Sequence, residues 1–108
     1  MSTEKETVEF IISKLGSRDR FKARPMFGEY AFYADNKVVG LICDNILYVK
    51  IMEQSSELED VCEKGPPYPD AKNYYVIEED QLSTFPKLPH ILFEIAKVIP
   101  EKQAKKKA

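Results

Sequence analysis

Between residues 20 and 51 the chain alternates β-prone runs with turn residues, and this pattern constrains the fold most. Four runs rich in aromatic and β-branched residues follow one another: RFKARPMF, EYAFYA, KVVGLIC and ILYVKI. The second and third connections are Asp35-Asn36 and Asp44-Asn45, pairs that favour tight turns. Because such short connections join antiparallel neighbours, we predict a four-stranded meander. Pro25 cannot donate to a ladder, so the first strand is expected at an edge or a bulge.

Three amphipathic segments are predicted to be helices. They are Thr3–Leu15, Ser56–Glu63 and Lys87–Ile99. Thr3 with Glu6, and Ser56 with Glu59, have the spacing of a capping box. The segment NYYVIE, residues 73–78, is predicted to be a fifth strand, whereas the proline-rich stretch before it is predicted to be a loop.

The predicted order is therefore α-β-β-β-β-α-β-α. The helices must bury their apolar stripes, and one face of the sheet is the available surface. We expect a two-layer α+β domain over residues 1–100, with an antiparallel sheet of about five strands and helices packed on one face. Residues 101–108 are expected to form a flexible basic tail. The whole chain carries −2, and a tail of +3 leaves −5 on the body.

Gly40 interrupts an otherwise bulky strand. A glycine inside a strand often permits a close approach, which we expect here from Tyr33 or from a helix residue. Replacing Gly40 by valine is predicted to destabilise the domain by overpacking.

Composition limits the possible classes of function. The apolar runs fall far short of the ~20 residues that span a bilayer, and the N-terminus lacks a signal-peptide pattern, so we expect a cytoplasmic protein without a membrane partner. Cys43 and Cys62 are too few for a disulfide framework or a zinc motif, and Cys43 is predicted to be a small buried hydrophobe. We predict no cofactor and no metal site.

The stretch from residue 24 to residue 51 resembles the N-terminal domain of the TfoX/Sxy competence regulators. The residues that carry this resemblance are Arg24, Pro25, Met26, Phe27 and Gly28, followed by Tyr48 and Lys50. The resemblance implies a helix-covered antiparallel sheet like that of type III secretion chaperones, which often dimerises. It also implies a regulatory role. The family often has a second glycine where this chain has Glu29, and its full-length regulators carry a further C-terminal domain.

The Arg-Pro-Met-Phe-Gly motif allows two interpretations. Its residues can serve backbone geometry, or they can form a lip that binds a partner protein. We favour the structural interpretation, because Pro25 and Gly28 are residue types that set backbone conformation.

A row of cations at every second position is the clearest candidate for anion or nucleic-acid contact. Its members are Arg18, Arg20, Lys22 and Arg24. On an extended strand they would share one face, either as a solvated edge that resists aggregation or as a phosphate contact. The acidic body favours the solvated edge.

Two other sets of residues allow more than one interpretation. The strand tyrosines and phenylalanines could stack bases, but a core or dimer interface is the better interpretation. His90 and Cys43 could serve an enzyme of unknown type, although nothing places an activated nucleophile beside the histidine. Our prediction is a non-catalytic domain that binds an unknown protein partner, forms a homodimer and acts in regulation. The alternative is weak nucleic-acid association through the basic row and the lysine tail.

Overall fold

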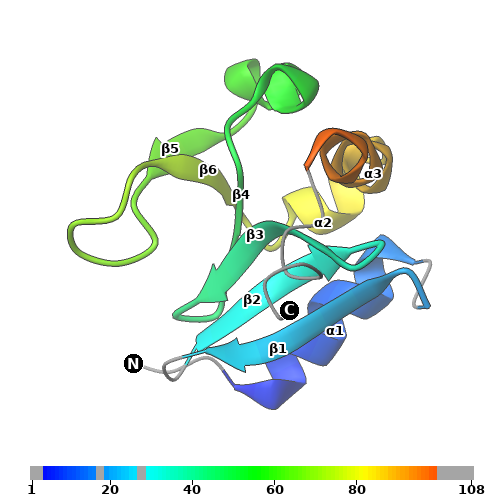
Figure 1. Ribbon diagram of the computed structural model, residues 1–108, viewed down its shortest axis with the longest axis vertical. Coiled ribbons are helices and arrows are strands. Elements are labelled where there is room, and N and C mark those ends of the chain that lie inside the picture. The colour runs from blue at the N-terminus through cyan, green and yellow to red at the C-terminus, as the bar shows by residue number, and fades with distance from the viewer. Residues whose placement is uncertain (1–3, 17–18, 27–28, 100–108) are drawn as a thin grey trace, which may run out of the picture.

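A computed structural model describes residues 4–16, 19–26 and 29–99 (Figure 1). Its elements are α1 (Lys5–Leu15), β1 (Phe21–Met26), β2 (Glu29–Ala34), β3 (Lys37–Cys43), β4 (Ile46–Val49), the 3-10 helix η1 (Glu53–Asp60), β5 (Glu63–Gly65), β6 (Tyr74–Ile77), α2 (Gln81–Thr84) and α3 (Leu88–Val98). Thr3, Arg18, Phe27, Gly28 and the segment 101–108 lie outside the described residues. The flexible tail therefore stays a prediction.

The strands form one antiparallel sheet in the order β1-β2-β3-β4-β6-β5. The predicted meander is confirmed, and β1, which holds Pro25, is an edge strand as expected. The sheet has six strands, because the short strand β5 occupies the start of a segment that we predicted to be a loop. It pairs with β6 from Glu63 opposite Val76 to Gly65 opposite Tyr74. Three residues ahead of a proline pair give too little pattern to predict a strand.

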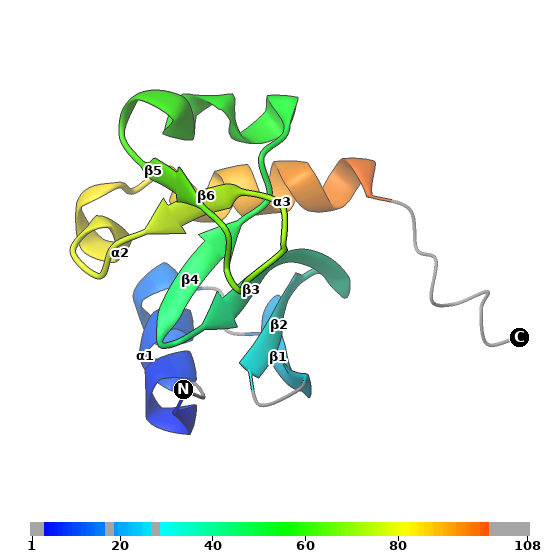
Figure 2. The same cartoon turned by 90° about the vertical axis from the view of Figure 1, so that its left-hand side faces the viewer.

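The main core lies between one face of the sheet, here called the inner face, and the helices α1 and α3 (Figures 1 and 2). Phe32 and Ile42 point into this core from β2 and β3 and are fully buried. The Phe21 ring stacks on both Phe32 and Phe93, with centroid distances of 5.5 and 4.9 Å. These contacts confirm the two-layer α+β architecture, since the helices bury their stripes on one face of the sheet.

Two predicted helices agree with the structure and one does not. The first begins at Lys5 with Glu4 as its N-cap, and the Glu4 N–H donates to Asn45 Oδ1 at 3.0 Å. The predicted cap residue Thr3 lies outside the described residues. The last helix forms close to the predicted bounds. The predicted helix from Ser56 to Glu63 is wrong, because this region forms the 3-10 helix η1 instead.

Ser55 explains where η1 begins. Its side chain is fully buried; Oγ accepts from the Met52 N–H at 2.9 Å and lies 2.8 Å from the Lys50 carbonyl oxygen, to which it can donate. This serine closes the turn after β4, three residues before Leu58, the apolar residue that η1 buries completely. Ser56, which we predicted to be the cap, is exposed.

A hydrogen-bonded cluster ties η1 to the end of the sheet. Glu59 accepts hydrogen bonds from the Tyr75 hydroxyl and from Lys64 Nζ, both at 2.9 Å. Burial, and then the bond to Glu59, raises the pKa of Tyr75 to about 12. The phenol therefore stays protonated and keeps donating at physiological pH.

Gly40 does permit a close approach, but from a different neighbour than expected. A Cβ at this position would overlap the backbone carbonyl oxygen of Tyr48 in β4. The register also shifts between Phe32 and Tyr33 of β2, opposite Gly40. The expectation that a Tyr33 or helix side chain fills the space is therefore wrong, since the strand backbone itself comes too near.

The helices are short. Within residues 4–16, 19–26 and 29–99, none has the length and apolar character needed to cross a bilayer.

Candidate functional site

Arg20, the second member of the predicted basic row, is built into the fold. It lies in the turn before β1, where its Nε and Nη2 donate to the two carboxylate oxygens of Asp35 at 2.8 and 2.6 Å. Its guanidinium also lies 3.7 Å from the ring centroid of Phe93 on α3. The hydrogen bonds from Arg20 lower the pKa of Asp35. Arg20 thus connects the turn before β1 to the turn after β2 and to α3.

Of the three described members of the row, Arg20 does not lie on the strand with the other two, because residues 19–20 form a turn. Lys22 and Arg24 do lie together, exposed, on the face of β1 opposite the buried Phe21. The Arg24 guanidinium lies 5.8 Å from the ring centroid of Tyr33 on β2. Two cations and one aromatic ring therefore occupy this corner of the sheet. Whether they bind an anion stays a prediction.

The sheet has a second apolar cluster on the face turned away from α1 and α3, here called the outer face. Its buried members are Ala31, Leu41, Cys43 and Tyr48, and half-buried Met26, Tyr33, Ile46, Tyr74 and Val76 pack against them. Strand alternation produces this face. The neighbours Tyr74 and Tyr75, for example, lie in different clusters. We predicted that the aromatic residues lie in a core or an interface, but we did not predict which of them lie on each face of the sheet.

The described residues of the family motif have different surroundings. Met26 and Tyr48 belong to the outer-face cluster, whereas Pro25 is exposed on the edge strand. The Lys50 N–H donates to the Val39 carbonyl at 3.1 Å, which continues the pairing of β3 with β4 by one residue. The choice between the structural and the binding interpretation of the motif stays a prediction, because Phe27 and Gly28 lie outside the described residues.

Cys43 lacks the properties of a nucleophile. Burial raises the pKa of its thiol to about 11, and the carboxylates of Glu29 and Asp44 add to the shift. Since the thiolate is the reactive form, this cysteine is a poor nucleophile at neutral pH. His90 is 72% exposed on α3, in the helix layer, whereas Cys43 lies on the outer face, so the two do not form a pair.

The loop between β5 and β6 lies on the outer side of the sheet, away from α3 (Figures 1 and 2). Tyr68 in this loop is 51% exposed. Burial raises the pKa of Tyr74, and the nearby Tyr68 and Cys43 add to the shift. The outer face thus ends in tyrosine rings that have both an apolar body and a polar tip.

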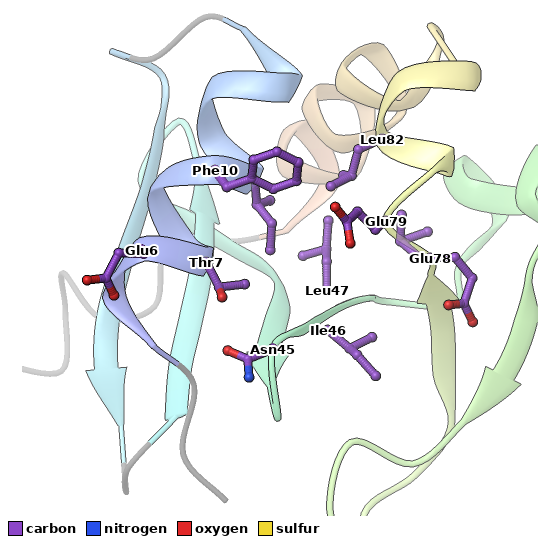
Figure 3. Close-up of a pocket in the computed structure, with 11 residues that line it drawn as sticks. Glu6, Thr7, Phe10, Asn45, Ile46, Leu47, Glu78, Glu79 and Leu82 are labelled. Atoms are coloured by element: carbon purple, nitrogen blue, oxygen red, sulfur yellow. The ribbon is translucent and has the colours of Figure 1, made fainter.

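A pocket of about 410 Å³ lies where α1, the start of β4, the end of β6 and α2 meet (Figure 3). Its apolar walls come from Phe10, Ile11, Ile46, Leu47, Ile77 and Leu82. Glu6 and Thr7 of α1 line one side, and Glu78 and Glu79 line the other (Figure 3). Within the described part of the chain, no group of three His, Cys, Asp or Glu residues could hold a metal ion.

No sequence pattern indicated this pocket. Glu78, Glu79 and Asp80 directly precede α2, which begins at Gln81. Glu6 was assigned only to a helix cap. The pocket joins residues more than 70 positions apart in the chain, such as Glu6 and Glu79, and no local pattern indicates such a meeting.

Comparisons with known proteins agree with the fold and the motif. The model of the TfoX N-terminal domain matches residues 13–92. A protein of Spirochaeta aurantia described as an uncharacterized 12.7 kDa protein in the trpE 5′ region is 36% identical over 106 residues, which cover 98% of this chain and 91% of that protein. The match to the family model spans most of the chain, including β1 to β6 and the first five residues of α3. The chain therefore belongs to the TfoX N-terminal domain family.

Proposed function

We propose that this domain is a non-catalytic, cytoplasmic protein-binding module that pairs with a second copy through the outer face of its sheet. The observation that supports this most is the apolar cluster on that face. A sheet covered by helices on one side commonly carries polar residues on the other. A contiguous apolar surface at that position is typical of an interaction site.

The charges at the two sheet edges favour a second copy as the occupant. Lys22 and Arg24 lie exposed on β1 at one edge, and Glu63, paired with the outer-face residue Val76, lies exposed on β5 at the other. A two-fold axis parallel to the strands would place β1 of one copy over β5 of the other. Each copy would then contribute the same cations and the same carboxylate, as an isologous interface requires.

The regulatory part of the proposal is supported by family membership. The chain belongs to the family of the TfoX N-terminal domain, and a paired domain of this kind could act by presenting a composite surface to a regulated protein. No step of this proposal requires catalysis. Cys43, with its raised pKa, serves only as a packed apolar residue.

Light scattering across micromolar to millimolar concentrations tests the pairing. We expect a mass of about twice the 12.5 kDa chain. Val76→Lys, in the half-buried rim of the outer face, should give a monomer with an unchanged circular dichroism spectrum. Val98→Lys, at a 48% exposed position on α3, is the matched control and should leave the mass unchanged. A monomer mass for the unmodified chain at every concentration would reject the pairing.

A second candidate function is nucleic-acid association, favoured by the exposed pair Lys22 and Arg24 beside the Tyr33 ring. Its weakness is the body charge of −5, which repels phosphates. Duplex DNA titrated at several salt concentrations separates the two functions, because each neutralised phosphate adds about 0.9 to the log–log slope. We expect little binding at physiological salt. Tight, salt-sensitive binding that Lys22→Glu and Arg24→Glu remove would favour this candidate instead.

A further inference from the structure

The pocket between α1 and α2 continues into a neighbouring hollow. Both are lined by Phe10, Glu78 and Glu79, and the hollow adds Lys14, Asp80 and Ser83. Together they form a groove, here called the α1–α2 groove, that begins beside Glu6. The ring of Phe10 is 37% exposed in its wall, although most large apolar side chains of the protein are buried. The groove therefore presents apolar surface within a concave site.

The carboxylates around this apolar surface have no ion pair among the described residues. They belong to Glu6, Glu78, Glu79 and Asp80. Lys14 is the one cation among the described residues that line the groove, and its Nζ lies 5.5 Å from the ring centroid of Phe10. The groove thus carries a net charge of −3 around an apolar wall.

We infer that the α1–α2 groove binds a segment of a partner protein in which one apolar side chain is flanked by lysines or arginines. The apolar side chain would enter the pocket against Leu47, Ile77 and Leu82, which line it and are buried. The cations on either side would meet Glu6 on α1 and Glu79 before α2, which line the pocket on different sides (Figure 3). Apolar and charged contacts together select such a segment over a purely basic or a purely apolar one.

Charge and shape argue against other occupants. Phosphates would be repelled by the carboxylates. The chain's own residues 101–108 are basic, but alanine is their only apolar residue type, so they offer little to the apolar wall. The inference does not depend on pairing of the outer face, because of the groove residues only Ile46 belongs to that cluster.

Fluorescence anisotropy with a labelled peptide tests the inference on the full chain. The probe is Gly-Lys-Lys-Leu-Lys-Lys-Gly, blocked at both ends. One control probe has alanine in place of leucine, and another has glutamates in place of the lysines. We expect the leucine probe to bind about fiftyfold more tightly than the alanine probe, because it buries three more carbon atoms. The glutamate probe should not bind.

Two matched protein variants locate the site. Glu6→Gln with Glu79→Gln removes a carboxylate from each side of the groove and should weaken binding of the leucine probe several-fold. Glu9→Gln with Glu53→Gln removes the same charge from exposed positions outside the groove and should leave binding unchanged. Circular dichroism melting should show both variants folded. Phe10→Ala should weaken the leucine probe more than the alanine probe.

Several outcomes would overturn the inference. Equal binding of the leucine and alanine probes would mean charge attraction alone. An equal loss in the two double variants would place the peptide elsewhere. If the probe bound only after the four lysines of residues 101–108 were changed to glutamine, the chain's own tail would be the occupant rather than a partner protein. Absence of binding by every protein variant would also reject the inference.

Discussion

The two faces of the sheet are both apolar, but they are sealed to different degrees. On the inner face, Phe32 and Ile42 are fully buried beneath α1 and α3. On the outer face, a few buried side chains are surrounded by half-buried ones, and none of the described helices with an apolar stripe covers them. The difference separates two roles of apolar residues. The inner face stabilises the fold by packing against the helices, whereas the side chains of the outer face pack against one another and still offer apolar surface to another molecule.

The largest expected effect comes from a pair of adjacent residues on opposite faces. Phe32→Ala should cost about 3–5 kcal/mol, because it opens a cavity beside the Phe21 ring. Tyr33→Ala, one residue later on the half-buried outer face, should cost only about 1 kcal/mol. Urea unfolding of both variants measures the difference. Equal losses would mean that the outer face is as much a core as the inner one.

Gly40 tests how closely the central strands approach each other. Gly40→Val should destabilise the protein by ~3 kcal/mol or prevent folding, since the new Cβ meets the Tyr48 carbonyl, which a strand cannot easily move. Gly65→Ala on the edge strand β5 is the control, because its Cβ would lie 3.7 Å from a Val76 methyl, an ordinary contact. Thermal melting of both variants measures the difference in stability. An unchanged melting temperature for Gly40→Val would show that β3 and β4 lie farther apart than the structure places them.

The difference between the faces also shows what the sequence could predict. Turn pairs such as Asp35-Asn36, both of which adopt positive φ, made the meander predictable, and the helical periodicity gave α1 and α3. The family motif was recognisable for the same local reason. Strand alternation could have divided Tyr74 from Tyr75, but it could not show which of the two faces the helices cover.

The remaining differences depend on contacts between distant parts of the chain. The turn that Ser55 caps depends on its burial, and the exposed Ser56 has the more typical capping spacing. Arg20 does not lie on the strand with Lys22 and Arg24. Its guanidinium instead lies over the ring of Phe93, more than 70 residues away in the chain. The α1–α2 groove exists only once both helices are placed. Local pattern cannot predict such meetings.

The reactivity of Cys43 measures how well the outer face is sealed. With its pKa raised from 9.0 to about 11, the native thiol should react with a disulfide reagent at pH 8 about a hundredfold more slowly than in the unfolded chain. Cys62→Ser isolates the signal of Cys43. The comparison in urea gives the unfolded rate. A native rate close to the urea rate would show that the outer-face cluster opens readily.

The smallest expected effect concerns Arg20, which lies next to the edge strand β1. Arg20 contacts Asp35 and the ring of Phe93 on the helix side, whereas Arg24 lies over Tyr33 on the outer side. Hydrogen bonding from Arg20 lowers the pKa of Asp35 below its ordinary 3.8. A lowered carboxyl pKa stabilises the fold above the unfolded value, and that contribution is lost as the pH falls through the folded value. The melting temperature of Asp35→Asn should therefore fall less than that of the unmodified protein between about pH 5 and pH 2.

The side chains of Arg20 and Asp35 are both substantially exposed, so added salt should reduce the difference between the two melting curves. Thermal melts across this range at low and high salt provide the measurement, with Arg24→Met as the control that should leave the acid part of the curve unchanged. Parallel curves for Asp35→Asn and the unmodified protein would show that the Arg20–Asp35 pair does not stabilise the edge, leaving the stack on Phe93 as the contact that holds Arg20 on the inner side.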